Sequence, residues 1–225
     1  MISPKLNQSL PATSFTKKTN EEVYKSLNFE DRQDFEDAYR GLIATMDFKI
    51  YKNDSGKVLW DTEMVEFLND PAPDTVNPSL WRNSQLQSIS GLFKVVDGVY
   101  QVRGLSISTT VLIEGKTGLI VCDTLKSIES AKAAMELYYK HQPKKPVTAI
   151  IISQSHVDHF GGVQAVLEYA ENPNIPIIVP QHYTKEAISE NVILGSIMKR
   201  RGQYQFGHVL PAGPKGTVSA GIGPV

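Results

Sequence analysis

Residues 147–170 read VTAIIISQSHVDHFGGVQAVLEYA and contain the pattern that decides the fold. A short apolar run, rich in β-branched residues, comes first and is typical of a buried strand. Two histidines and an aspartate follow it, and two glycines end the polar loop. Apolar residues then recur at helical spacing. The sequence therefore predicts a strand, a loop of metal-binding side chains and a helix.

The side chains of this loop are His156, Asp158 and His159. Imidazole nitrogen and carboxylate oxygen suit zinc, and also iron or manganese. Gly161 and Gly162 let the backbone approach a metal or an anion closely, and they open the following helix. A solvated histidine-rich loop is the alternative, but the strand before it and the helix after it favour a metal site.

The composition excludes several other classes of protein. The net charge of −1 gives no electrostatic reason to expect a nucleic acid or an anionic membrane surface as partner. The single cysteine, Cys122, excludes an intrachain disulfide and lies in an apolar run, where we expect a buried small side chain. No secretory signal is present, and no apolar run approaches the roughly 20 residues that span a bilayer. We expect a soluble, cytoplasmic protein.

The chain divides into three parts. Residues 1–20 are polar and predict a mobile arm. Residues 21–90 predict a helical and irregular segment, in which a long helix begins near Asn20 and an irregular proline-rich stretch is fixed by Trp81. The expected apolar face of that helix consists of Phe29, Phe35, Tyr39 and Ile43.

Residues 91–225 predict an α/β domain. Stretches 98–104, 107–114 and 119–124 are rich in β-branched and aromatic residues and indicate an antiparallel meander. Helices are expected over 127–141, with Ser127 as N-cap, and over 184–201, and a buried strand is expected over 175–180. Strand and helix alternate in this part, which favours α/β over all-β.

The last stretch, LPAGPKGTVSAGIGPV at 210–225, contains turn formers and no predicted strand or helix. We therefore expect an incomplete domain in a truncated chain or fragment, with a sheet that lacks its second half. Such a sheet has an exposed apolar edge at the strands over 147–153 and 175–180, which favours aggregation.

The loop and several other blocks resemble a known family. The strand, SHVDHFGG and the helix resemble the signature loop of the metallo-β-lactamase superfamily. Five blocks are similar to successive parts of its alkylsulfatase branch: FEDRQDFEDAYRGLIA (29–44), PDTVNPSLWR (73–82), GLFKVVDGVYQVRG (91–104), AISENVILGSIMKRRGQY (187–204) and LPAGPKGTVSAGIG (210–223). The resemblance implies the N-terminal half of an αββα sandwich, preceded by a helical N-terminal segment.

The resemblance also implies a reaction and a ligand set. The family hydrolyses alkyl sulfate esters to alcohol and sulfate, uses two zinc ions and commonly forms homodimers. By position, His156 resembles a ligand of the first metal, and Asp158 and His159 resemble ligands of the second. Gln154 stands where the family has the first histidine of its His-x-His-x-Asp-His pattern. An amide is a poor zinc donor beside imidazole, so we expect at most partial zinc occupancy.

Other residues receive lesser roles. Asp123 ends a predicted core strand, and two roles remain open for it: orienting a ligand histidine or capping a turn. Structural or solvated positions are expected for Glu186 and Glu190. Surface positions are expected for His141, His182 and His208, and anion contacts are conceivable for Arg103, Arg200 and Arg201. The family's remaining ligands, two glutamates and a histidine, match no part of this chain.

Two functions stay open from the sequence. The first is a zinc-dependent alkylsulfatase, impaired in this chain. The second is a non-catalytic remnant of such an enzyme, indicated by Gln154 and by the incomplete ligand set. A thioester or lactone hydrolase of the same superfamily is disfavoured by the N-terminal blocks.

Overall fold

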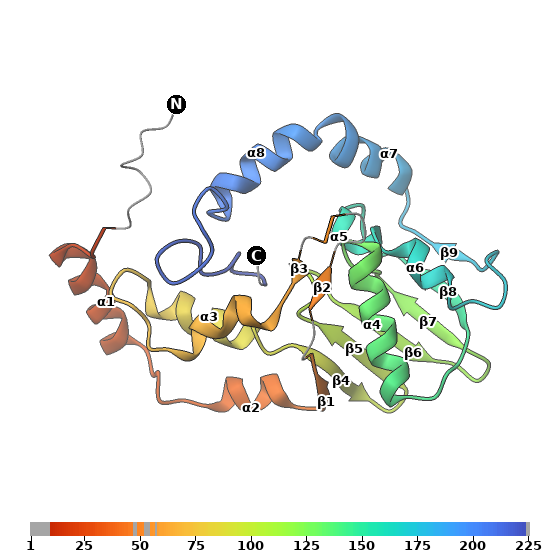
Figure 1. The fold of residues 1–225 in the computed structure, drawn as a ribbon, viewed down its shortest axis with the longest axis horizontal. Coiled ribbons are helices and arrows are strands. Elements are labelled where there is room, and N and C mark those ends of the chain that lie inside the picture. Colours follow the sequence, from red (N-terminus) through yellow and green to blue (C-terminus); the bar gives the residue numbers. More distant parts are fainter. Residues whose placement is uncertain (1–9, 47–48, 52–54, 57, 224–225) are drawn as a thin grey trace.

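The computed structural model describes residues 10–46, 49–51, 55–56 and 58–223. Within them, seven strands form one sheet in the order β1-β4-β5-β6-β7-β8-β9, and β2 and β3 form a separate hairpin (Figure 1). The strands are β1 (Leu42–Thr45), β2 (Ile50–Tyr51), β3 (Val58–Trp60), β4 (Gly91–Val96), β5 (Val99–Arg103), β6 (Thr110–Glu114), β7 (Leu119–Cys122), β8 (Val147–Ile151) and β9 (Ile177–Ile178).

The pairing changes direction along the sheet. Strands β4 to β7 form the expected antiparallel meander, and β1 pairs antiparallel to β4. Strands β8 and β9 then add parallel to β7. The helices are α1 (Ser14–Ser26), α2 (Gln33–Tyr39), α3 (Pro78–Gln87), α4 (Ile128–His141), α5 (Val157–Phe160), α6 (Val163–Leu167), α7 (Tyr183–Ile188) and α8 (Gly195–Gln205), with a 3-10 helix η2 (Thr62–Asn69) and a π-helix η3 (Ser189–Ile193).

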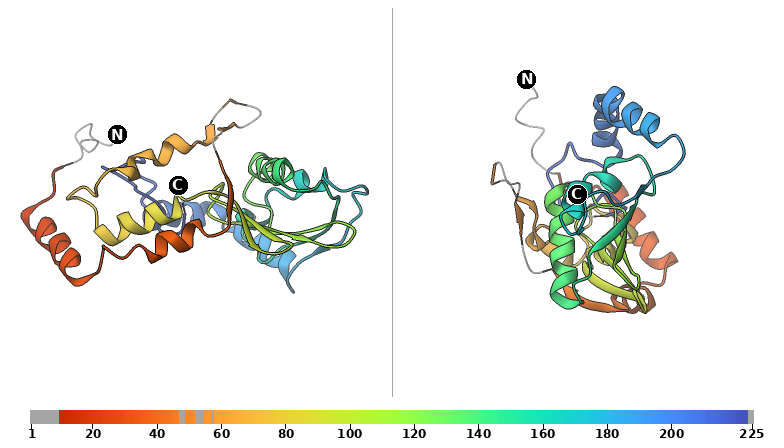
Figure 2. Two further views of the ribbon diagram at one scale, coloured as in Figure 1. Left: turned by 90° about the horizontal axis from the view of Figure 1, so that it is seen from below. Right: turned by 90° about the vertical axis from the view of Figure 1, so that its right-hand side faces the viewer.

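One face of the sheet is buried and the other is not. Alternate strand residues such as Leu112, Val121 and Ile150 are fully buried in the cluster that α4 and α6 complete. Their neighbours on the opposite face, such as Ile113 and Ile120, are only partly buried. Figure 2 shows α4 lying over one side of the sheet. This α/β layer is the predicted half of an αββα sandwich, and the fold class is confirmed.

The helix over 127–141 forms as predicted, because the Ser127 side chain accepts a hydrogen bond from the backbone N–H of Ser130. The helix predicted over 184–201 is interrupted. It divides into α7, η3 and α8, which arch away from the sheet (Figure 1). The stretch 210–223 contains no helix and no strand beyond an isolated bridge between Ala212 and Thr217.

The long helix expected in the N-terminal segment is wrong: α1 ends at Ser26 and α2 begins at Gln33, so Phe29 of its expected apolar face lies between two helices. The helical pattern also differs from the prediction at both ends. It begins at Ser14 rather than near Asn20, because Thr13 caps it with its side chain, and residues 1–9 of the expected arm lie outside the described residues. The helical pattern through Ile43 is broken at Gly41, whose φ of +76° turns the chain into β1. A Cβ at Gly41 would lie 2.1 Å from the Lys94 carbonyl oxygen, so strand β1 can approach β4 only with glycine there.

The proline-rich segment is more regular than predicted. Asn77 caps α3 through its side chain and Pro78 begins the helix, so the stretch contains a helix that we expected to be irregular. Trp81 on this helix is 4% exposed, and its indole N–H donates to the Asp70 carbonyl, which confirms its fixing role.

The strand over 175–180 is shorter and less buried than predicted. Only β9 forms there, and Ile177 and Ile178 are 42% and 54% exposed, because β9 is the edge strand and no described element covers it. The burial prediction is wrong, whereas the predicted exposed apolar edge is confirmed at β9. None of the described helices is long and apolar enough to cross a membrane.

Candidate metal site

The loop of His156, Asp158 and His159 lies between β8 and α6, at the end of the parallel strands. Its residues 157–160 form the short helix α5. The backbone holds it against the β7–α4 connection, because Thr124 N–H donates to the His159 carbonyl at 2.7 Å. The Ser108 hydroxyl, on the β5–β6 connection, donates to the Asp158 carbonyl. Two neighbouring connections therefore fix the loop.

The two glycines pack the loop rather than open space for a ligand. A Cβ at Gly161 would lie 2.0 Å from the Lys126 carbonyl oxygen. A Cβ at Gly162 would lie 2.2 Å from the Thr124 carbonyl oxygen and 2.3 Å from Cβ of Ala131. Their described role is thus close contact with the β7–α4 connection and α4, and our interpretation of them as room for a metal has no support here.

Asp123 joins the loop to strand β7. Its φ of +57° turns the carboxylate toward the loop. One oxygen, Oδ2, lies 2.7 Å from His159 Nδ1, and the other, Oδ1, accepts from the Ser153 backbone N–H at 2.7 Å. The Ser153 hydroxyl also donates to Oδ2 at 2.7 Å. A carboxylate only accepts, so His159 Nδ1 carries the proton of this hydrogen bond, and in the neutral imidazole Nε2 then has a lone pair.

The Nε2 atom of His159 faces two side chains of its own loop. Asp158 Oδ2 lies 3.2 Å away. Two donors of one tetrahedral zinc ion, each at about 2.0–2.1 Å from it, lie about 3.3 Å apart. The spacing of Asp158 and His159 therefore fits two ligands of a common cation.

Gln154 occupies the other approach to this nitrogen. Its Nε2 lies 2.6 Å from His159 Nε2. Gln154 is itself exposed, so it reaches His159 from the solvent side. Gln154, which departs from the family pattern, is thus in direct contact with the nitrogen of His159 that Asp158 also faces.

His156 points to a different partner. Its Nε2 lies 3.4 Å from Glu190 Oε2. The same carboxylate oxygen accepts from the Ser155 hydroxyl at 2.9 Å, and the Asn191 side chain donates to the Ser155 carbonyl at 2.9 Å. Glu190 and Asn191 lie on η3, so the π-helix contacts the loop through these two side chains. The structural role expected for Glu190 agrees with these contacts, but its pairing with His156 was not predicted.

The described side chains fit one half of a metal centre and not the whole. Asp158 and His159 converge, whereas His156 is engaged by Glu190. No group of three or more His, Cys, Asp and Glu residues in the described part of the chain could hold a metal ion.

The other sequence candidates lie apart from the loop. Arg103 stacks on the Phe93 ring, with its guanidinium carbon 3.6 Å from the ring centroid, and donates to the Ala38 carbonyl. Burial raises the pKa of the Cys122 thiol, which is only partly buried, and this disfavours a nucleophilic role. The remaining candidates are exposed, as expected for the histidines: His141, His182, His208, Arg200 and Arg201.

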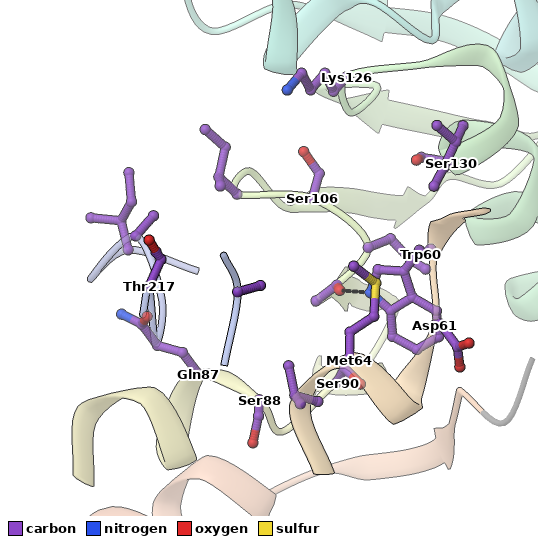
Figure 3. A pocket seen from close by; sticks show the side chains of 18 of the residues that line it. Trp60, Asp61, Met64, Gln87, Ser88, Ser90, Ser106, Lys126, Ser130 and Thr217 are labelled. Carbon is purple, nitrogen blue, oxygen red and sulfur yellow. Dashed lines mark hydrogen bonds between the residues drawn. The ribbon is translucent and has the colours of Figure 1, made fainter. Parts of the chain in front are cut away.

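A cavity of about 640 Å³ is lined by two connections that contact the loop, although no residue of 153–162 lines it. Its wall is largely apolar and includes Leu59, Trp60, Met64, Phe67, Leu105, Ile107, Phe206, Val218 and Ile222. Figure 3 shows Trp60 and Met64 on one side of it and Gln87 and Thr217 on another. The β5–β6 connection lines the cavity with Ser106 and contacts the loop of residues 153–162 through Ser108. The β7–α4 connection lines it with Lys126 and contacts the same loop through Thr124.

Two polar atoms in the cavity wall lack partners. Among the described side chains, Gln87 Oε1 and Ser106 Oγ are buried without a hydrogen bond. Buried polar groups are normally paired, so these two atoms suit a polar ligand group or water. The cavity was not predicted, because segments far apart in the sequence build it.

Comparison with known proteins shows which family this chain is similar to. The pattern of the Metallo-beta-lactamase superfamily matches residues 103–204. An (R)-specific secondary-alkylsulfatase of Pseudomonas sp. is 46% identical over 95% of this chain and 33% of its own length. The chain is homologous to alkylsulfatases. The alkyl/aryl-sulfatase BDS1 of Saccharomyces cerevisiae is also 46% identical to this alkylsulfatase homologue, over 92% of the chain and 33% of the yeast protein.

A solved structure agrees with the sequence comparison. The stereoselective inverting sec-alkylsulfatase Pisa1 of Pseudomonas sp. superposes with a TM-score of 0.88 at 45% identity, over 97% of this alkylsulfatase homologue and 35% of Pisa1. The chain therefore spans about a third of the length of the relatives it matches. The predicted resemblance to alkylsulfatases is confirmed, and the matching superfamily is named for its metal dependence.

Proposed function

We propose that this chain forms part of an alkyl sulfate ester hydrolase. The observation that carries the proposal is that the Asp123–His159–Asp158 arrangement contacts two connections that also line a largely apolar cavity, in a chain similar to alkylsulfatases. The substrate would be a small molecule with an alkyl chain and a sulfate ester, which is the substrate type in the relatives' names.

The cavity supports an alkyl substrate. Moving the methylene groups of an alkyl chain from water to its apolar wall stabilises the complex by about 0.8 kcal/mol for each group. Lys126 and the unpaired Ser106 hydroxyl line the same cavity, on connections that also contact the loop. A polar head near these two groups and an alkyl chain toward Trp60 and Met64 would match the chemistry of the wall.

We infer that the metal is zinc and that Asp158 and His159 are its donors in this chain. Asp123 holds the imidazole so that Nε2 keeps its lone pair, and Ser153 in turn fixes Asp123. When bound, zinc would polarise the ester and lower the pKa of a bound water. His156 would contribute to a second zinc ion only after leaving Glu190, so we expect partial zinc occupancy.

A non-catalytic chain is the second candidate. It is favoured by one observation: Gln154 and Glu190 contact the Nε2 atoms of the two loop histidines, Gln154 by a hydrogen bond to His159 and Glu190 at 3.4 Å from His156. For both candidate functions we also propose that two copies of the chain form a homodimer. Sedimentation velocity would test this proposal.

The cavity assignment is tested by fluorescence. Trp60 lies in the cavity wall, so octyl sulfate, added below its micellar concentration, is expected to change the tryptophan emission in a saturable way. Inorganic sulfate alone should not, and a Trp60→Phe variant should lose the change. An equal response of the Trp60→Phe variant would contradict the assignment, because the remaining Trp81 does not line the cavity.

A further inference from the structure

Two side chains of this chain contact the Nε2 atoms of the loop histidines His156 and His159, the atoms that we propose for metal binding. Gln154 Nε2 lies 2.6 Å from His159 Nε2, and Glu190 Oε2 lies 3.4 Å from His156 Nε2. The contact of Gln154 is the shorter and involves the histidine that is already oriented by Asp123. The Gln154 contact therefore decides whether the Asp158–His159 pair is free to bind a metal ion.

The direction of this hydrogen bond follows from Asp123. Because the Asp123 carboxylate accepts from His159 Nδ1–H, Nε2 of the neutral imidazole has a lone pair and no proton. Gln154 must then donate its amide N–H to that lone pair. A metal ion needs the same lone pair, so the Gln154 hydrogen bond and a metal bond exclude each other.

We propose that Gln154 is an internal cap that competes with metal for His159. The amide satisfies the oriented nitrogen in the metal-free chain and lowers the affinity of the Asp158–His159 pair for zinc. This inference rests on the proposed role of Asp158 and His159 as metal donors. The Gln154 side chain is exposed, so it can leave without disturbing the core.

A zinc titration of the full chain tests the cap. Isothermal titration of Gln154→Ala with zinc should give a Kd about fivefold lower than that of the unchanged chain, since a hydrogen bond to be broken costs about 1 kcal/mol. The matched control is Gln181→Ala, which removes another exposed glutamine and should leave the Kd unchanged. Adding Asp158→Asn to Gln154→Ala should remove the gain.

A second readout examines the metal-free chain directly. The ¹⁵N shift of His159 Nε2 should be that of an unprotonated, hydrogen-bonded nitrogen, and it should move in Gln154→Ala but not in Gln181→Ala. Equal zinc affinities with and without Gln154, or an unmoved ¹⁵N shift, would overturn the cap. A gain that survives Asp158→Asn would leave the cap standing and refute the proposed donor pair instead.

Discussion

Asp123 Oδ2 lies 2.7 Å from Nδ1 of His159, and the same carboxylate accepts from the backbone and hydroxyl of Ser153. The sequence left two roles open for Asp123, orienting a histidine and capping a turn. The geometry agrees with the first role, because one carboxylate oxygen faces the imidazole; the other accepts from the Ser153 backbone after β8 rather than capping a turn of its own segment. Asp123 thereby connects the end of strand β7 to the loop that contains Ser153 and His159.

The first prediction concerns the tautomer of His159. Asp123→Asn keeps the left-handed backbone, which asparagine tolerates, but presents an amide N–H to Nδ1. We expect the His159 proton to move to Nε2, so the metal-binding lone pair is lost. Histidine ¹⁵N NMR of the metal-free chain should show the exchange of protonated nitrogens. An unchanged tautomer would mean that Asp123 does not set it.

The second prediction concerns the packing of the loop glycines. Gly162→Ala places a methyl group 2.2 Å from the Thr124 carbonyl oxygen, and we expect a loss of about 2–3 kcal/mol in the free energy of unfolding. Gly195→Ala, in α8, is the matched control, because the nearest atom to its Cβ would be the Glu190 carbonyl oxygen, 3.9 Å away. Urea unfolding should leave this control equal or slightly more stable. Equal effects of both changes would contradict the packing role.

The third prediction concerns acid stability. Lys49 Nζ lies 2.7 Å from Asp61 Oδ2, and the hydrogen bond from this ammonium holds the pKa of the Asp61 carboxyl below its usual range. The unfolded chain binds the proton first as the pH falls. The pair's contribution to stability is therefore full above the ordinary aspartate pKa of about 3.9 and is lost as the pH falls through the lowered value.

Urea midpoints between about pH 5 and about pH 2 measure this contribution. The midpoint should fall less steeply in Asp61→Asn than in the unchanged chain. Lys49→Met should likewise flatten the fall, because Asp61 then regains an ordinary pKa. A fall of the same steepness in all three proteins would show that the pair contributes nothing.

The fourth prediction concerns the exposed edge of the sheet. Ile178 on β9 is 54% exposed at an edge that no described element covers. Ile178→Lys should reduce self-association, because a lysine on an edge strand opposes further pairing. Val96→Lys is the control, since Val96 is similarly exposed but ends the inner strand β4. Light scattering at several concentrations should separate the two, and an equal effect of both would refute edge pairing.

The strand–loop–helix core was predictable because its signals are local. Apolar runs define β7 and β8, and Ser127 caps α4 as its sequence indicates. The end of the first helical pattern was missed, although Gly41 carried the signal. Its positive φ matters only because β1 pairs with β4, some 50 residues later, and a local pattern does not contain that pairing.

The sequence singled out residues of the loop and did not reveal how the folded chain arranges them. The sequence named His156, Asp158, His159, Gln154 and Asp123, but gave no means to see that Glu190 turns His156 away. This contact depends on the π-helix η3, which brings Glu190 and Asn191 onto the loop. The cavity depends likewise on segments that meet only in the folded chain, from Trp60 to Ile222.

The central claim is that the chain has half of an alkylsulfatase metal centre, capped by Gln154. Zinc content and dodecyl sulfate hydrolysis, measured on one zinc-equilibrated preparation, test it most directly. The account predicts well under one equivalent of bound zinc and no turnover, with a rise in bound zinc in Gln154→His. Two equivalents of zinc with dodecyl sulfate turnover in the unchanged chain would contradict it.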